Sequence, residues 1–179
     1  MASAPPPFQN PIGSQKWMFT SPFGPRINPV THEYQSLHNG LDIAVPTGTT
    51  VLASAPGVVT TAGYTDINGN WVKVDHGGGW STAYLHLSQI GVKQGQTVTT
   101  GQQLGLSGAT GRATGPHLHF IIYRDNAPVD PKPLVSWTTA LVATVASATT
   151  SPYLWPAVGA ATLLLIAAAW RRRESNGSP

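Results

Sequence analysis

The stretch Gly115-Pro-His-Leu-His-Phe-Ile-Ile-Tyr123 predicts a β-strand, because β-branched and aromatic residues dominate it and a Gly-Pro pair would set its start. Successive side chains of a strand point to opposite faces, so alternate residues share a face. His117 and His119 are therefore expected to point the same way. One of these imidazoles can bind a metal ion while the other lies near a substrate.

The residues around this stretch predict an all-β domain. Short β-rich runs alternate with Gly, Pro and Asn turns from Lys16 to about Asp130. The chain has 19 Gly and 16 Pro but only 9% charged residues, which suits tight turns between strands better than helices. We expect strands at residues 17–20, 50–54, 57–64, 71–75, 81–87, 96–99 and 117–123. Seven or more such strands indicate an antiparallel sheet.

A second motif, His38-Asn-Gly-Leu-Asp42, lies upstream and supplies an imidazole and a carboxylate. Its Asn-Gly pair and the following Ile43-Ala-Val-Pro46 favour a turn that enters a strand over a helix, and the glycine would permit that turn. Such a turn can aim both side chains at one point, and zinc accepts both ligand types at about 2.0–2.2 Å. With one imidazole of the first motif, the chain has three metal ligands.

The chain offers histidines, and no other side chains in a suitable context, to move protons beside such a metal. Three protein ligands leave one tetrahedral position open for a water, whose pKa zinc lowers from 15.7 to about 7. Glu33 and Glu174 are the only glutamates, and neither belongs to a His-Glu-x-x-His motif. Cysteine is absent, which excludes thiolate ligands and nucleophiles. Imidazoles, with an ordinary pKa near 6.5, remain, and His86 in Tyr84-Leu-His-Leu87 adds another.

Two further histidines are expected to have structural or no roles. His76 follows a predicted strand in Asp75-His-Gly-Gly-Gly79 and is expected to be a turn residue. His32 precedes Glu33 in a polar loop and is expected to take no part in the chemistry.

The ordered series of motifs resembles the lysostaphin-type zinc endopeptidases, which cut peptidoglycan. The resemblance extends from about Phe23 to Pro131, and no proposed ligand position departs from the pattern. It rests on Phe23-Gly-Pro-Arg26, residues 38–48, Ala55-Pro-Gly-Val-Val59, Tyr84-Leu-His-Leu87, Gly95-Gln-Thr-Val98, Gly101-Gln-Gln-Leu-Gly105, residues 111–120 and Val129-Asp-Pro131.

This resemblance implies both a fold and an activity. The fold would be an antiparallel sheet or open barrel of the lysostaphin type, also described as a duplicated hybrid motif. One Zn²⁺ per chain would be bound by His38, Asp42 and His119, and His86 and His117 would be the catalytic imidazoles. The enzyme would be a metalloendopeptidase that hydrolyses a cross-bridge or stem-peptide bond of peptidoglycan.

Two other functions compete with this one. A catalytically inactive cell-wall-binding or activator domain would share the fold. A lipoyl- or biotinyl-type carrier is suggested by residues 92–105, but Met1 and Met18 are the only methionines and neither neighbours a suitable lysine. Nucleic-acid binding has little support, because residues 1–152 carry seven Lys/Arg against six Asp/Glu and show no basic face with interleaved aromatics.

The two ends of the chain are expected to lie outside this domain. Residues 1–14 are interpreted as a flexible Pro-rich leader, 15–133 as the zinc endopeptidase domain and 134–152 as a stalk, either helical or loose. Residues 153–170 carry no charge and are long enough for one transmembrane helix, with Trp155 and Trp170 near its ends. The Arg triplet at 171–173 predicts a cytoplasmic tail over 171–179, with the β domain on the cell-wall side of the membrane.

Overall fold

The computed structural model describes residues 3–27 and 33–137, and this part of the chain contains strands and no helix. The antiparallel all-β prediction is therefore confirmed. The strands are β1 Phe8–Gln9, β2 Met18–Ser21, β3 Gly24–Ile27, β4 Tyr34–His38, β5 Leu41–Ala44, β6 Thr50–Leu52, β7 Gly57–Thr65, β8 Gly69–Gly77, β9 Trp80–Ile90, β10 Thr97–Val98, β11 Gln103–Ser107, β12 His117–Arg124, β13 Ala127–Val129 and β14 Val135–Ser136.

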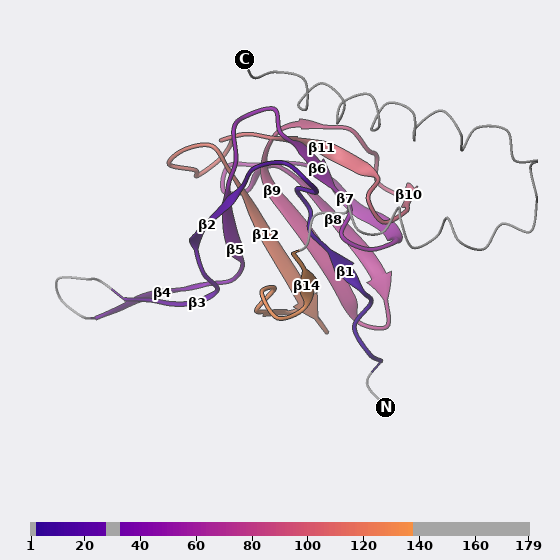
Figure 1. The fold of residues 1–179 in the computed structure, drawn as a ribbon, viewed down its shortest axis with the longest axis horizontal. Coiled ribbons are helices and arrows are strands. Elements are labelled where there is room, and N and C mark those ends of the chain that lie inside the picture. The colour runs from indigo at the N-terminus through magenta and orange to yellow at the C-terminus, as the bar shows by residue number, and fades with distance from the viewer. Residues whose placement is uncertain (1–2, 28–32, 138–179) are drawn as a thin grey trace, which may run out of the picture. The chain divides into compact units, whose positions relative to one another are not determined.

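Most strands join one sheet in the order β10-β7-β8-β9-β12-β5-β2, with antiparallel pairing throughout (Figure 1). Strand β11 pairs with both β6 and β9, and β13 pairs with β12. Each of the seven predicted runs overlaps a strand of this sheet. The sheet brings β5 and β12, which are far apart in sequence, into direct contact.

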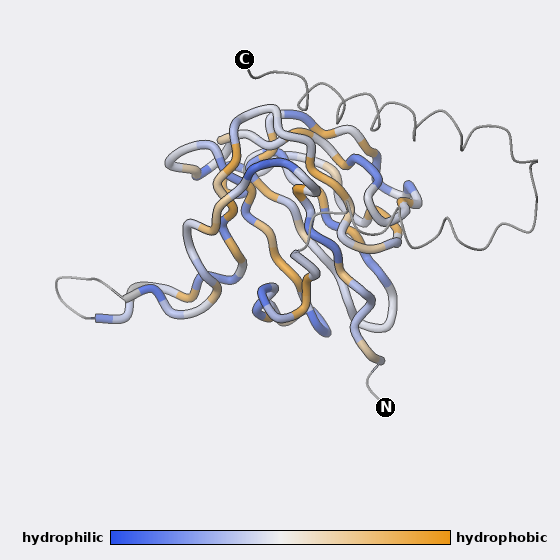
Figure 2. The backbone as a smooth tube through the Cα atoms, in the orientation of Figure 1, coloured by the Kyte–Doolittle hydropathy of each residue, from blue (hydrophilic) through white to orange (hydrophobic). Residues whose placement is uncertain are grey.

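Strand β12 separates the hydrophobic core from a cleft. Leu118, Phe120 and Ile122 belong to the core, whereas His117 and His119 line the cleft on the opposite face. Hydrophobic residues run along much of this strand (Figure 2). The alternation expected from the sequence is confirmed, and it fixes both imidazoles on one side of the sheet.

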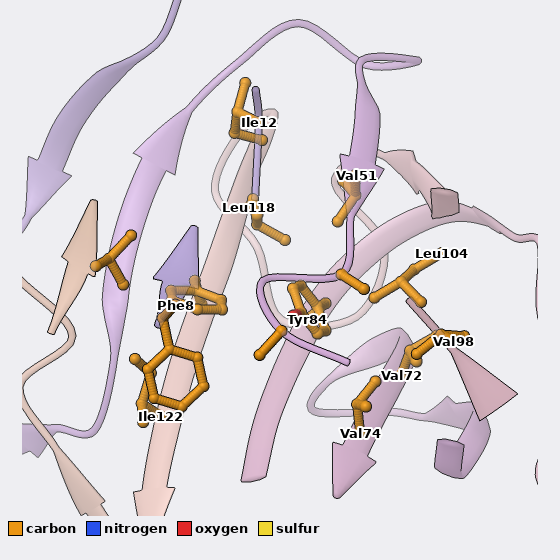
Figure 3. Packing of buried hydrophobic residues seen from close by; sticks show 14 of the residues in the cluster. Phe8, Ile12, Val51, Val72, Val74, Tyr84, Val98, Leu104, Leu118 and Ile122 are labelled. Atoms are coloured by element: carbon orange, nitrogen blue, oxygen red, sulfur yellow. The ribbon is translucent and has the colours of Figure 1, made fainter. Parts of the chain in front are cut away.

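The N-terminal segment is part of the core, so the prediction of a flexible leader over residues 1–14 is wrong for residues 8–12. Phe8 and Ile12 are fully buried, and Figure 3 shows Phe8 beside Ile122. Phe8 pairs with Val135 in a short parallel bridge between β1 and β14. The predicted boundary at residue 133 is therefore also too early, because burial of apolar side chains holds residues beyond it on the domain.

Strands β3 and β4 form a separate hairpin that extends away from the main sheet (Figure 1). Its last residue, His38, leads into β5. Within the described ranges, no helix is long and apolar enough to cross a membrane. The predicted span at 153–170, the basic tail and most of the predicted stalk lie outside the described residues.

Candidate metal centre

Three strands bring the predicted metal ligands together. His38 ends β4, Asp42 lies in β5 and His119 lies in β12. His119 is directly opposite Asp42 in the antiparallel pairing of β12 with β5. Directly opposed residues of a sheet have adjacent Cβ atoms, so the register itself places this imidazole beside this carboxylate.

The ligand atoms of these three residues have the spacing of a small cation site. Nε2 of His38 lies 3.1 Å from Asp42 Oδ1 and 3.1 Å from Nδ1 of His119. Asp42 Oδ1 and His119 Nδ1 are 2.6 Å apart. Zinc with bonds of about 2.0–2.2 Å in tetrahedral geometry holds its ligands about 3.3–3.6 Å apart. These three residues therefore fit a zinc ion after the ligand atoms separate by less than about 1 Å.

Each ligand imidazole is oriented by a hydrogen bond from the ring nitrogen that faces away from the other two ligands. Nδ1 of His38 donates to the carbonyl of Pro22 at 2.6 Å, and Nε2 of His119 donates to Oδ1 of Asn39 at 3.1 Å. A nitrogen that donates carries the proton, so the opposite nitrogen has its lone pair free for a metal ion. Asn39 lies inside the His38–Asp42 motif, but no functional role was predicted for it, because its contact with His119 depends on the pairing of distant strands.

Asp42 is ionised at all ordinary pH values. Burial alone would raise its pKa, but without a metal ion the adjacent His119 and His38 rings can be protonated on the nitrogens that face Asp42, and their hydrogen bonds and charge then lower that pKa well below its usual range. Its second oxygen, Oδ2, accepts from Arg26 at 3.3 Å. A negatively charged ligand between two neutral imidazoles suits a divalent cation and would leave a net charge of about +1.

Gly40 is required for close packing and not for a left-handed turn. A Cβ at this position would lie 2.6 Å from the carbonyl oxygen of Phe120 and 2.9 Å from Nε2 of His119. The sequence suggested that this glycine permits a turn. The structure gives a different reason for it, because any side chain here would displace the ligand His119.

His86 and His117 form a second pair beside the ligands. Their ring centroids are 4.8 Å apart, and the His86 ring is 6.0 Å from that of His119. Nδ1 of His86 donates to the carbonyl of Thr110, and Nδ1 of His117 donates to the carbonyl of Gly115, both at 2.8 Å. Nε2 of each ring forms no hydrogen bond within the described part of the chain. These two nitrogens are available to a bound molecule.

The position of His86 depends on a β-bulge. The register of β9 against β8 shifts so that Leu85 and His86 together lie opposite Trp71. Because of this bulge both Leu85 and His86 line the cleft, while Tyr84 and Leu87 are in the core. His86 has a φ of 64°, a left-handed conformation that costs a non-glycine residue about 1–3 kcal/mol. Bulges often re-aim a side chain next to an active site.

Burial lowers the pKa of His86, and the proximity of His117 and His119 adds to this effect, whereas the hydrogen bond to the Thr110 carbonyl and the charge of Asp42 oppose it. A lowered pKa keeps the imidazole neutral near pH 7. A neutral imidazole with a free Nε2 can accept a proton.

The site lies where two grooves meet. A cleft of about 450 Å³ extends over β9 and β12, and a groove of about 670 Å³ extends along β2, β5 and the start of β12. Asp42, His117, Arg26 and Thr114 line both. An extended chain could therefore lie across the metal ligands with segments on both sides.

His76 is part of strand β8 and not the turn residue expected from the sequence. Nδ1 donates to the carbonyl of Pro56 and Nε2 accepts from the Thr82 hydroxyl, both at 2.8 Å. Its two ring nitrogens are thus satisfied by the protein, which agrees with a structural role. His32 lies outside the described residues.

An antiparallel β domain that gathers two imidazoles and one carboxylate beside an open cleft has the construction of a zinc hydrolase with a single metal ion. Comparison with known proteins gives the particular family. The chain belongs to peptidase family M23, whose model matches residues 36–131. The resemblance to lysostaphin-type peptidases is thereby confirmed, and the carrier alternative is not supported.

Three similar proteins illustrate this relationship. Peptidoglycan DD-endopeptidase ShyA of Vibrio cholerae is 47% identical over 124 residues, which are 69% of this chain and 29% of that protein. A zinc-containing peptidase from V. cholerae superposes with a TM-score of 0.64 and 41% identity, over 69% of this chain and 39% of the other. The catalytic domain of lysostaphin from Staphylococcus simulans gives a TM-score of 0.58 and 32% identity, over 65% and 90% respectively. The chain thus spans less than a third of the length of ShyA.

Proposed function

We propose that this protein is a zinc-dependent endopeptidase that hydrolyses a peptide bond of peptidoglycan. The observation that carries the proposal is the convergence of His38, Asp42 and His119 on one point, beside two imidazoles with free Nε2 atoms. A zinc ion bound there would supply an activated water and polarise the scissile carbonyl.

The protein's own residues would perform the proton transfers. Neutral His86 accepts a proton at Nε2, because Thr110 holds Nδ1 in the protonated form. Nε2 of His117 lies 3.8 Å from Asp42 Oδ1, so this ring nitrogen faces the ligand set beside which an activated water would be bound. The pair can therefore take a proton from the attacking water and return one to the leaving amine. Arg26 would hold Asp42 in its orientation through Oδ2.

Peptidoglycan is proposed as the substrate because a DD-endopeptidase that acts on it shares 47% identity with this chain. The two grooves that meet at the ligands have room for peptide on both sides of the bond. A purified full-length chain should release peptides with new amino and carboxyl ends from sacculi, as detected by mass spectrometry. A chelator should abolish release, and added Zn²⁺ should restore it.

A catalytically inactive wall-binding or activator domain is the second candidate. It is disfavoured because all three ligands and both further histidines are present and oriented by hydrogen bonds. In the same assay an inactive domain would sediment with sacculi but release no peptide, whether or not Zn²⁺ is present.

We further propose that residues 153–170 anchor the protein in the cell membrane, with the β domain on the cell-wall side. Support comes from the uncharged run, the tryptophans near its ends and the Arg triplet that follows. A charge at the centre of a spanning helix costs about 2.5–3.5 kcal/mol, so Leu164→Arg should move much of the protein out of the membrane fraction. Inaccessibility of the β domain to protease added outside intact cells would contradict this orientation.

A further inference from the structure

The loop between β11 and β12 contains both backbone groups that orient the proposed catalytic imidazoles. Its ends meet at a bridge between Gly108 and His117, where the His117 amide donates to the Gly108 carbonyl at 3.1 Å. Thr110 binds His86 and Gly115 binds His117 through their carbonyls. Arg112 lies between these two carbonyls, so its backbone position is tied to the reaction centre.

The backbone of Arg112 is also fixed against the turn between β7 and β8. Its amide donates to the carbonyl of Ile67 at 3.0 Å. The preceding Gly111 has a φ of 71°, and a Cβ there would lie 2.2 Å from the amide nitrogen of Gly69. Two glycine backbones in direct contact leave little room for the loop to shift.

The side chain of Arg112, in contrast, has no partner among the residues that the structure describes. It is exposed and lines the 450 Å³ cleft. The other charged residues that line this cleft are Arg26 and Asp42, which bind each other at 3.3 Å. Arg112 is therefore an unpaired cation on a fixed backbone beside the reaction centre.

The surroundings of Arg112 favour an anion as its partner. One part of the cleft wall is apolar, with Leu85 and Ile121 in a small cluster flanked by Trp71 and Tyr123. A guanidinium binds a carboxylate through two parallel hydrogen bonds, and such a pair is stronger where water is partly excluded.

We propose that Arg112 binds a carboxylate of the substrate peptide and so selects carboxylate-bearing peptides over uncharged ones such as glycine bridges. This inference rests on the proposed function. Peptidoglycan peptides offer two sources of a carboxylate near a cross-link, the side chain of a diamino dicarboxylic residue and the carboxyl terminus of the peptide. The chemistry of recognition is the same for both.

The test uses three soluble muropeptide dimers with the same scissile bond and the zinc-loaded full-length chain. The first dimer has both carboxylates free, the second is amidated at the diamino-acid side chain, and the third is amidated at the carboxyl terminus. Amidation of the recognised group should raise the KM of the wild type about tenfold, the value of one charge-assisted interaction, with little change in kcat. The dimer that loses affinity identifies the source.

The Arg112→Gln variant should raise the KM of the free dimer by a similar factor and no longer distinguish the three dimers. Arg112→Lys should keep part of the discrimination between the dimers, because lysine keeps the positive charge but cannot form the bidentate hydrogen bonds of a guanidinium. Lys93→Gln removes an exposed charge outside both grooves and should change nothing. Equal effects of Arg112→Gln on all dimers, or an effect on kcat alone, would overturn the proposal.

Failure of the proposed function has a different outcome, in which the wild type hydrolyses none of the dimers. Titration calorimetry of the same dimers then decides the role of Arg112. Weaker binding of the free dimer to Arg112→Gln than to the wild type supports the carboxylate site, and equal binding overturns it.

Discussion

Histidines on neighbouring strands of one sheet differ in how many of their ring nitrogens the protein satisfies. His76 on β8 uses both, through the Pro56 carbonyl and the Thr82 hydroxyl. His86 on β9 and His117 on β12 use one each, through the carbonyls of Thr110 and Gly115. The face of the sheet explains the difference, because Thr82 is buried on the core side while the other two rings line the cleft.

This comparison separates structural from reactive imidazoles without reference to sequence motifs. A ring with two satisfied nitrogens has none left for a ligand and serves the fold, whereas burial lowers the pKa of His76 and of His86 alike. A ring with one nitrogen held by a carbonyl has a defined tautomer and a free nitrogen for a ligand or a proton. By this criterion His86 and His117 each have a nitrogen free for chemistry, whereas the second nitrogens of His38 and His119 face Asp42 as proposed metal ligands.

The largest effect is expected from removing Asp42, the carboxylate that both ligand imidazoles of the cleft contact. Asp42→Ala should reduce bound zinc from one per chain to near zero and hydrolysis to background, because it removes the only negative ligand. Elemental analysis of purified protein measures this directly. His76→Gln is the matched control and should keep its zinc. An undiminished zinc ratio in Asp42→Ala would contradict the site.

A smaller effect is expected for the two imidazoles that have a free Nε2 but lie outside the ligand set. His86→Ala and His117→Ala should retain zinc while losing about 10²–10⁴ in rate, the usual contribution of a positioned acid or base. Rates on sacculi together with zinc content separate this from loss of metal. Zinc loss in His117→Ala would mean that it and His119 exchange roles, and full activity in both variants would reject the proton-transfer roles.

The next prediction tests whether the hydrogen bond of His119 Nε2, the ring nitrogen that would not bind zinc, contributes to zinc affinity. Asn39→Ala removes the acceptor of the His119 Nε2 hydrogen bond, and loss of such a partner commonly weakens metal binding about 10- to 100-fold. Competition with a zinc chelator gives the affinity. Asn39→Asp keeps an acceptor and should retain tight binding. Equal affinities of Asn39→Ala and the wild type would show that the register of β5 and β12 alone orients His119.

Much of this architecture could be predicted from the sequence because strands alternate. The placement of Leu118 in the core and of His117 and His119 on the cleft follows from the period of two. The same rule fails at His86, where a bulge puts Leu85 and His86 on one face. A bulge depends on pairing with β8, which the local sequence does not specify, so His86 was predicted from the lack of other bases and from the family resemblance and not from strand alternation.

Other features escaped prediction because they depend on tertiary contacts. The segment around Phe8 lacks any strand pattern, yet its aromatic ring fills space beside Ile122 in the core (Figure 3). Arg112 appeared in the sequence as one residue of a motif, and its lack of an internal partner could be recognised only once the cleft was known. Gly40 looked like a turn residue, whereas the constraint comes from Phe120 and His119 across the sheet.

The smallest effect concerns stability, and it tests the structural member of the comparison. Because the folded-state pKa of His76 is lowered from 6.5, the unfolded chain binds more protons through this residue as the pH falls through about 6.5. Its contribution to the free energy of unfolding is present above that pH and is lost toward the lowered pKa. The free energy of unfolding of the His76→Gln variant should therefore depend less on pH than that of the wild type.

Urea unfolding of both chains at pH 7.5 and 5.5 measures this difference. Zinc release at the lower pH affects both proteins alike, so it cancels in the comparison. Asp75, whose charge acts to raise the pKa of His76, is the same in both chains and cancels as well. The wild type should lose more free energy of unfolding between the two pH values than the variant does. Identical losses would mean that His76 titrates as it does in the unfolded chain, and its two hydrogen bonds would then not distinguish it from the imidazoles of the cleft.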